Sequence, residues 1–335
     1  MVCAGITPSG AWNREDPQGS SLCCGVTRRG ERMRRTLFTA LFSACLALVL
    51  AGGSLEAAPE RIVSLSPVGT EMLFALGQGE RIIAVTEFCD YPPEAMERPS
   101  IGGFATLNLE GLLAMGTDLL VIQDLHEQFV PQLERLNIPH VLLRQDGIDD
   151  VYAGLADLGR ACGAEPRASA EIERIRGEVE AVRRTVRAAA SRPSVLVSVS
   201  RELSEPTVTA FYAAGRRTFY NELVELAGGV NASHEERIAY PRIAQEGLAI
   251  LNPDVVLDLV GDRRFYHSGD GLDVDAVFQR DALVRQWTAG VATNAVRSGQ
   301  IHILEGTVYL RPGPRIGAML RSFAERIHPE LEWAP

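Results

Sequence analysis

Apolar and polar positions follow two alternating periods along most of this chain. Short apolar runs at residues 61–65, 119–122 and 194–199 are typical of strands buried in a sheet. Between such runs, apolar residues recur three and four positions apart, which indicates amphipathic helices. Strand and helix patterns succeed one another through most of the chain, so the sequence predicts an α/β fold with largely parallel sheets covered by helices.

One block of this pattern occurs twice, at residues 110–122 and 246–258. In each copy an acidic residue, Glu110 or Glu246, opens a short amphipathic helix, a turn follows, and an aspartate leads into an apolar run. Two equivalent units of this kind predict two similar α/β lobes. Such an arrangement favours the binding of a ligand between the lobes.

Residues 168–190 form one long helical pattern with a single apolar stripe, and Pro193 ends it. We therefore expect one stiff helix to join the lobes, with only a small opening motion when a ligand binds. The predicted organisation is a leader at 1–57, a first lobe at 58–165, a linking helix at 166–192 and a second lobe at 193–335.

The leader has the three-part order of a secretory signal. Basic residues follow Met33, residues 37–50 are an apolar run too short for a comfortable membrane span, and small residues come next. We interpret residues 1–32 as an upstream extension and Met33 as the start; the alternative is a disordered N-terminal tail that is really made. The apolar run continues beyond Cys45, so we expect a cleaved, exported product rather than a lipid-anchored one.

Composition and motifs exclude some classes of function. A net charge of −10 gives no electrostatic support for binding nucleic acid. The sequence has no nucleophile elbow, dinucleotide fingerprint or phosphate loop, and its six histidines are dispersed, so we expect no catalytic residue, no metal site and no cofactor. An exported enzyme that uses His234 or His267 remains an alternative. Cys89 and Cys162, which follow the leader, either pair or remain two free thiols.

Several short segments, in their order and spacing, also resemble a known family. They are Arg61-Ile-Val-Ser-Leu-Ser-Pro67, Cys89-Asp-Tyr-Pro-Pro93, Asn108-Leu-Glu110, Glu225-Leu-Ala-Gly-Gly229, Tyr240-Pro241 and Asn252-Pro-Asp254. From about residue 60 to 330 the chain resembles the periplasmic binding proteins of ABC importers for vitamin B12, haem and ferric siderophores. The Asp-Tyr-Pro-Pro and Asn-Leu-Glu segments are most similar to the vitamin B12-binding members.

The resemblance implies a bilobal α/β fold with a helical backbone, a periplasmic location and a permease dimer as partner; we expect the protein itself to be a monomer. In the family, one surface glutamate of each lobe docks onto arginines of the two permease subunits. Glu110 and Glu246 occupy those positions, and their separated carboxylates would set the orientation of the complex. The alternative is that each glutamate only caps its helix.

The resemblance places the ligand contacts where the lobes face each other. By position they fall on Phe88, Phe104, Tyr212 and Tyr240, with Tyr91 and Tyr309 as neighbours and with Arg311 and Thr307 as further contacts. Aromatic walls suit a large, partly apolar ligand, because they supply contact area at little cost in side-chain entropy.

Some positions depart from the vitamin B12-binding members. Those proteins carry tryptophans where this chain has Phe104, Gln123 and Tyr240, and the aspartate that they place near the final arginine falls on Thr307. These departures weaken cobalamin as the specific ligand but leave the class of protein unchanged. From the resemblance we expect a non-catalytic receptor for a corrinoid, meaning a cobalamin-like ligand. The alternatives are a haem or ferric-siderophore receptor of the same family, or an exported enzyme or sensor on the same scaffold.

Overall fold

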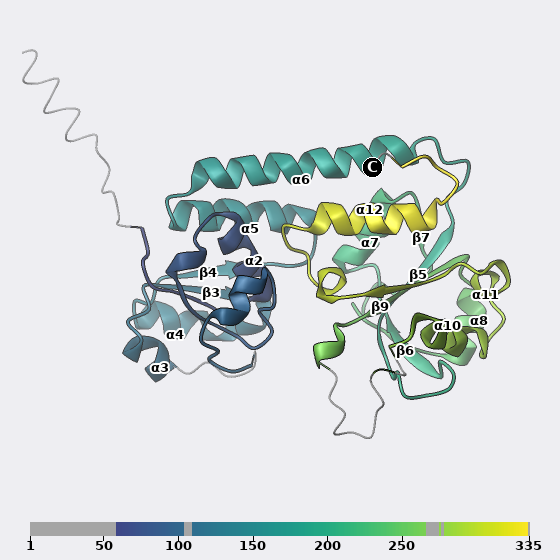
Figure 1. Cartoon of the computed structure of the whole chain (residues 1–335), viewed down its shortest axis with the longest axis horizontal. Helices are drawn as coiled ribbons and strands as arrows, with labels where there is room; N and C mark the ends of the chain where they lie inside the picture. The colour runs from purple at the N-terminus through teal and green to yellow at the C-terminus, as the bar shows by residue number, and fades with distance from the viewer. Residues whose placement is uncertain (1–57, 104–108, 266–274, 276–277, 334–335) are drawn as a thin grey trace, which may run out of the picture. The chain divides into compact units, whose positions relative to one another are not determined.

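The computed structural model describes residues 58–103, 109–265, 275 and 278–333, all within one compact unit that begins at Ala58 (Figure 1). The predicted leader, Met33 and Cys45 lie outside the described residues, as do Phe104 and His267. No helix of the described ranges is long and apolar enough to cross a membrane.

The first lobe is built on a four-stranded sheet of order β2-β1-β3-β4, in which each neighbouring pair is parallel. Its strands are β1 (Ile62–Ser64), β2 (Ile82–Val85), β3 (Leu119–Gln123) and β4 (His140–Leu143). Its α-helices are α2 (Pro67–Ala75), α3 (Leu109–Ala114), α4 (Val130–Arg135) and α5 (Ile148–Ala161), with 3₁₀ turns η1 (Gly79–Arg81), η2 (Pro93–Glu97) and η3 (Asp124–Phe129).

The second lobe has a six-stranded sheet of order β10-β9-β5-β6-β8, with β7 also paired to β5. Its strands are β5 (Ser194–Arg201), β6 (Ala210–Ala213), β7 (Val230–Asn231), β8 (Arg242–Ala244), β9 (Val255–Val260) and β10 (Ile301–Glu305). Its α-helices are α7 (Phe219–Leu226), α8 (Gln245–Leu251), α10 (Arg280–Thr288), α11 (Asn294–Ser298) and α12 (Ile316–Ile327), with 3₁₀ turns η4 (Arg263–Phe265) and η6 (Thr307–Leu310).

The two sheets share one parallel core. The order β7-β5-β9-β10 repeats β2-β1-β3-β4, and β6 and β8 add an antiparallel edge to the second lobe alone. The repeated block lies at equivalent places, since α3 leads into β3 beside β1 and α8 leads into β9 beside β5. The prediction of an α/β fold with two similar lobes is confirmed.

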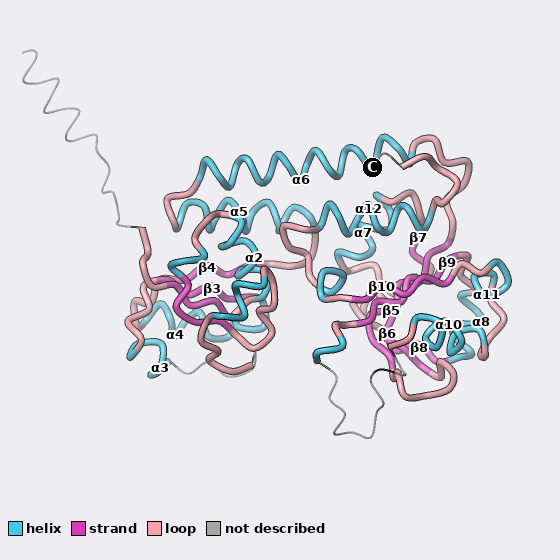
Figure 2. Tube along the Cα trace, viewed as in Figure 1, coloured by secondary structure: helices cyan, strands magenta, loops and turns pink. Residues whose placement is uncertain are grey.

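The long helix is α6 (Glu165–Val186), which packs against α5 of the first lobe and α12 of the second (Figures 1 and 2). Its buried residues Ile175, Val179 and Val182 belong to a hydrophobic core that includes residues of both sheets. The predicted helix span of 168–190 was wrong at both ends. The helix stops at Val186 because the apolar stripe that holds it to its neighbours ends there.

Both faces of each sheet are covered by helices. On the first sheet, Val63 and Leu120 pack with Leu112 of α3 and Leu133 of α4, whereas Ile62 belongs to the core shared with α6. Adjacent residues of β1 therefore face opposite layers, as the twofold period of a strand requires. This layering leaves the loops at the strand ends as the places where polar side chains gather.

Candidate functional site

The loops that follow the parallel strands carry the residues that connect the two lobes. The carboxyl ends of parallel strands meet at one edge of their sheet, and ligands of open α/β folds bind there. In the first lobe this edge carries the loop after β2, at residues 86–92. In the second lobe it carries the residues after β9, which include Arg264, and those after β10, at 306–315.

Asp90 is the centre of a polar cluster between these loops. Its carboxylate, which is only 4% exposed, accepts a hydrogen bond of 2.9 Å from the Thr307 hydroxyl and forms ion pairs with Arg311 at 2.5 Å and Arg264 at 3.3 Å. Arg311 also donates to the carbonyl of Phe88 at 2.8 Å. Three side chains of the second lobe thus hold one loop of the first.

In this cluster, two of the predicted ligand contacts are already bonded to other residues of the protein. Thr307 is buried and its hydroxyl is engaged by Asp90, while the Arg311 side chain is 13% exposed and bonded on both terminal nitrogens. An aspartate, Asp90, does lie beside Arg311, but it belongs to the opposite lobe. Any ligand that contacts Arg311 must share it with Asp90.

Three of the predicted aromatic contacts are open to solvent. Tyr91, Tyr212 and Tyr240 are 41%, 45% and 42% exposed, far above the core aromatics of either lobe. Phe88 is half-buried, and Phe104 lies outside the described residues. Tyr309, named with Tyr91 as a neighbour of the site, instead pairs its hydroxyl with Ser322 on α12 at 3.0 Å.

Tyr91 is held in place by a second ion pair between the lobes. Arg315 lies over its ring, 3.7 Å from the ring centre, and forms a two-point ion pair with Glu71 on α2 at 2.7 and 2.9 Å. Burial raises the pKa of the Glu71 carboxyl, and the positive charge of Arg315 offsets only part of this. A buried two-point pair of this kind fixes geometry more than it adds stability.

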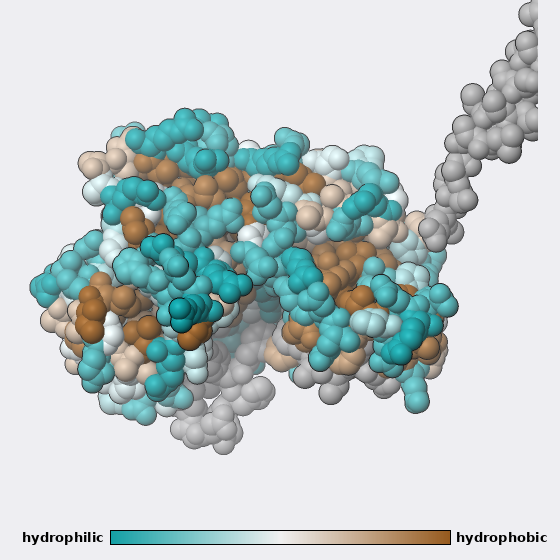
Figure 3. Space-filling view, turned by 180° about the vertical axis from the view of Figure 1, so that it is seen from behind, coloured by the Kyte–Doolittle hydropathy of each residue, from teal (hydrophilic) through white to brown (hydrophobic). Residues whose placement is uncertain are grey.

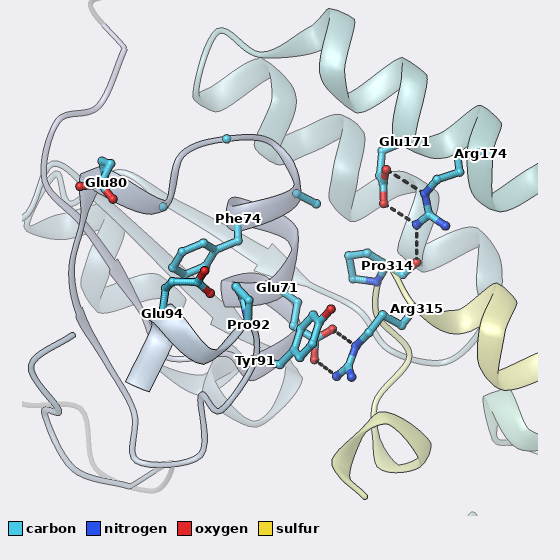
Figure 4. Close-up of a pocket in the computed structure, with 13 residues that line it drawn as sticks. Glu71, Phe74, Glu80, Tyr91, Pro92, Glu94, Glu171, Arg174, Pro314 and Arg315 are labelled. Carbon is cyan, nitrogen blue, oxygen red and sulfur yellow. Dashed lines mark hydrogen bonds and ion pairs between the residues drawn. The ribbon is translucent and has the colours of Figure 1, made fainter. Parts of the chain in front are cut away.

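The same residues line a pocket of about 660 Å³ beside α2 and α6 (Figure 4). Of the predicted ligand contacts, only Tyr91 lines it. Its two arginines are already neutralised, Arg315 by Glu71 and Arg174 by Glu171 and Glu178. Among its described lining residues, the pocket therefore offers a ligand no unpaired cation, and it does not coincide with the predicted site.

A further contact joins the lobes near Tyr240. The carboxylate of Glu222 on α7 accepts a hydrogen bond of 2.9 Å from the backbone N–H of Ile148, the first residue of α5. A side chain of one lobe thus caps a helix of the other, which is favourable for the helix dipole. Partial burial, together with the negative charge of Asp146 beside this helix start, raises the pKa of Tyr240.

Glu110 and Glu246 occupy equivalent positions, each in the first turn of its short helix, and both are exposed. The residue that caps α8 is Ala244, and the side chain of Glu246 makes no hydrogen bond or ion pair within the described ranges. The aspartates of the two blocks are also equivalent. Asp118 accepts backbone N–H groups at the start of β1, and Asp254 accepts that of Ser194 at the start of β5.

Within the described ranges, the cysteines and histidines form neither a disulfide nor a metal site. Cys89 and Cys162 are both buried free thiols, which decides the question that the sequence left open. His234 is exposed and lies 3.5 Å from Arg216, a cation that does not favour metal binding. Among the residues that the structure describes, no three histidine, cysteine or acidic side chains are placed to hold a metal ion.

Sequence reasoning did not identify the residues that tie the lobes together, namely Asp90, Arg264, Glu71, Arg315 and Glu222. Asp90 stands inside a segment that was singled out, Cys89-Asp-Tyr-Pro-Pro93, but no spacing in the sequence connects it with residues more than 170 positions away. An aspartate directly before Tyr-Pro-Pro in an apolar context was the one available signal.

Comparison with known proteins places the chain in a family. The sequence profile described as periplasmic binding protein matches residues 62–304, which span both sheets. The chain belongs to the periplasmic binding protein family. Members of this family bind solutes and are not enzymes, which supports the absence of catalysis at the level of the family.

Individual relatives of this chain are also substrate-binding proteins. An uncharacterised ABC transporter substrate-binding lipoprotein of Bacillus subtilis (strain 168) is 25% identical over 279 residues, covering 81% of each chain. A vitamin B12-binding protein of Pectobacterium atrosepticum is 28% identical over 206 residues, covering 60% of this chain and 72% of the relative. The apo structure of a periplasmic haem-binding protein from Roseiflexus sp. RS-1 is 27% identical with a TM-score of 0.65, covering 81% of this chain and 98% of that one.

Proposed function

We propose that this protein is the periplasmic substrate-binding receptor of an ABC importer. It captures a corrinoid between its lobes and delivers it to the membrane permease. The observation that carries the proposal is the family match, which extends over both lobes, together with vitamin B12-binding relatives at 28% identity. In the first lobe, the loop that follows β2 carries the exposed Tyr91, and the second lobe exposes Tyr212 and Tyr240.

The proposed ligand contacts are the exposed tyrosines, with Phe88 and Phe104 beside them. A corrinoid presents a broad, partly apolar face, and tyrosine rings match it while their hydroxyls stay hydrated. Thr307 and Arg311 contribute through Asp90, which they hold in place. In this proposal the protein needs no resident cofactor and acts as a monomer.

A haem or ferric-siderophore ligand is the second candidate. It is favoured by the haem-binding relative of known structure at 27% identity and by the phenol groups of the exposed tyrosines, because phenolate oxygen is a ligand of ferric iron. The two candidates differ in what they require of a tyrosine. A corrinoid needs the ring, whereas a ferric centre with an open position needs the hydroxyl.

The test is isothermal titration of residues 58–335 with cyanocobalamin, cobinamide, haemin and a ferric hydroxamate siderophore. We expect saturable one-to-one binding of a corrinoid. Tyr240→Ala should weaken it about tenfold, because a large buried contact is lost, and Tyr240→Phe should change it little. Tyr309→Phe, at a tyrosine that points to α12, is the matched control.

Haemin binding that Tyr212→Phe or Tyr240→Phe abolishes, with a change in the Soret band, would replace the corrinoid by haem. Binding of none of the four ligands would contradict the receptor proposal.

We also propose that Glu110 and Glu246 dock onto the two permease subunits. Charge reversal of both, Glu110→Lys with Glu246→Lys, should leave ligand affinity intact and abolish transport in reconstituted vesicles. Loss of ligand binding in this variant would contradict the docking role.

A further inference from the structure

Both repeated helices expose a large aliphatic side chain beside the glutamate. On α3, Leu113 follows Glu110 by three positions and is 52% exposed. On α8, Ile250 follows Glu246 by four positions and is 84% exposed. Residues three and four apart on a helix are neighbours on its surface, so each helix presents a carboxylate and an aliphatic group from one face.

These aliphatic residues are not needed for the fold. The residues that anchor the two helices to their sheets are Leu112 and Leu248, at 2% and 3% exposure. Other apolar residues also reach the surface, among them Leu136 at 43% and Ile238 at 57%. Figure 3 shows hydrophobic surface at several places on the face of the molecule that it draws. Exposure alone is therefore not decisive.

Their place in the repeat distinguishes Leu113 and Ile250. They lie in the two copies of one sequence block, one position out of register, on helices that hold equivalent places in the two lobes. The side chains of Glu110 and Glu246 have no hydrogen-bond or ion-pair partner within the described part of the chain. Each copy thus exposes one anionic and one aliphatic side chain on its short helix.

We propose that these are two docking patches: a first patch of Glu110, Leu113 and Ala114, and a second patch of Glu246, Ala249 and Ile250, all exposed. This rests on the proposed receptor function and adds apolar residues to its docking surface. The partner is a membrane permease of two equivalent subunits, each with a cationic group next to an apolar depression.

Two features of the patches favour this partner over others. Two equivalent patches on one chain match a partner with two equivalent subunits, each of which meets one patch. A carboxylate in each patch favours a cationic surface and opposes an anionic lipid surface, which agrees with the net charge of −10.

The two groups have separable effects on binding. Exposed carboxylates steer the encounter and set orientation, so they act on the association rate and their effect falls with salt. A buried aliphatic side chain acts on the dissociation rate, and its effect is insensitive to salt. The proposal therefore predicts two different kinetic signatures from neighbouring residues.

The test measures binding of ligand-loaded protein to the permease dimer of its importer, purified in lipid nanodiscs, by biolayer interferometry at low and high salt. Leu113→Gln with Ile250→Gln should weaken binding at least about tenfold, through faster dissociation and with an unchanged salt dependence. Glu110→Gln with Glu246→Gln should slow association and flatten the salt dependence. Leu136→Gln with Ile238→Gln is the control and should bind as the wild type does.

Several outcomes would overturn the proposal. One is binding by the Leu113→Gln, Ile250→Gln variant within twofold of the control. Another is wild-type binding to protein-free vesicles, or self-association in light scattering, that this variant abolishes. If Glu110→Lys with Glu246→Lys still prevents transport while the aliphatic variant binds normally, the receptor function stands and only this inference fails. Wild-type protein that binds neither permease nor corrinoid would remove both.

Discussion

Replacing Asp90 by asparagine tests how strongly the polar cluster holds the two lobes together. The asparagine side chain keeps the shape and can still accept the bond from Thr307, but it removes the negative charge. Among the described residues, Arg311 then retains its hydrogen bond to the carbonyl of Phe88, in a site where its side chain is 13% exposed. The substitution therefore removes the ion-pair partner of a largely buried cation.

The magnitude follows from the burial of each ion pair. Breaking a buried pair costs about 3–5 kcal/mol, because the remaining charge is uncompensated. The pair with Arg264, whose side chain is 48% exposed, adds only about 0–1 kcal/mol. We expect Asp90→Asn to lose about 3 kcal/mol, which for a unit of this size lowers the melting temperature by roughly 5 °C.

The assay is thermal unfolding followed by circular dichroism, with a double-mutant cycle. Asp90→Asn combined with Arg311→Gln should be less destabilised than the sum of the two single variants, by about 2 kcal/mol. Glu80→Gln is the matched control, because Glu80 also meets an arginine at 3.0 Å but is 94% exposed; it should change stability by less than about 0.5 kcal/mol. An Asp90→Asn protein as stable as the control, or additive single effects, would refute the reasoning.

Two further predictions concern titratable groups. Burial raises the pKa of the Cys162 thiol to about 11, and Cys89 is likewise buried. Residues 58–335 should therefore show almost no thiol that reacts with Ellman's reagent in the native state, and both thiols should react after unfolding. Fewer than two reactive thiols after unfolding would indicate a disulfide. Burial, with the charges of Arg326 and Arg280, lowers the pKa of His302 to about 4, below its usual 6.5. The neutral ring is thus favoured by folding, and its contribution, present above pH 6.5, is lost as the pH falls towards 4. His302→Gln should flatten the melting temperature over that window relative to His234→Gln, and parallel curves would contradict this.

The local pattern of the sequence predicts most of the fold, because strand and helix periods report burial directly. β3 at Leu119–Gln123 and the strand after Asp254 were predicted nearly to the residue. The pattern of apolar residues predicts a turn at Ser66-Pro67 and a helix that starts at Thr70, but α2 begins at Pro67. This error was avoidable, because a serine followed by a proline is a common helix start: Ser66 accepts the bond of a helix N-cap and Pro67 is the first helical residue.

Other features depend on tertiary contacts that no local period reports. Asp258 is fully buried in the middle of β9, where a strand pattern predicts an apolar residue. It is tolerated because Arg201 and the indole N–H of Trp287, from separate elements, both bond to it at 2.9 Å. Such a buried network becomes recognisable only once the three residues are in one place.

The candidate site shows the same division between local and distant information. Position and resemblance are enough to infer the exposed tyrosines and the glutamates that open the repeated helices, because each is a property of one segment. What Arg311 does cannot, because the residue that engages it lies 221 positions earlier. A ligand contact and a tie between lobes are alternative uses of one guanidinium, and the sequence favours neither. The Asp90→Asn protein separates them: if Arg311 is a ligand contact that Asp90 restrains, its release raises ligand affinity, and if Arg311 serves only to hold the lobes, ligand affinity falls together with stability.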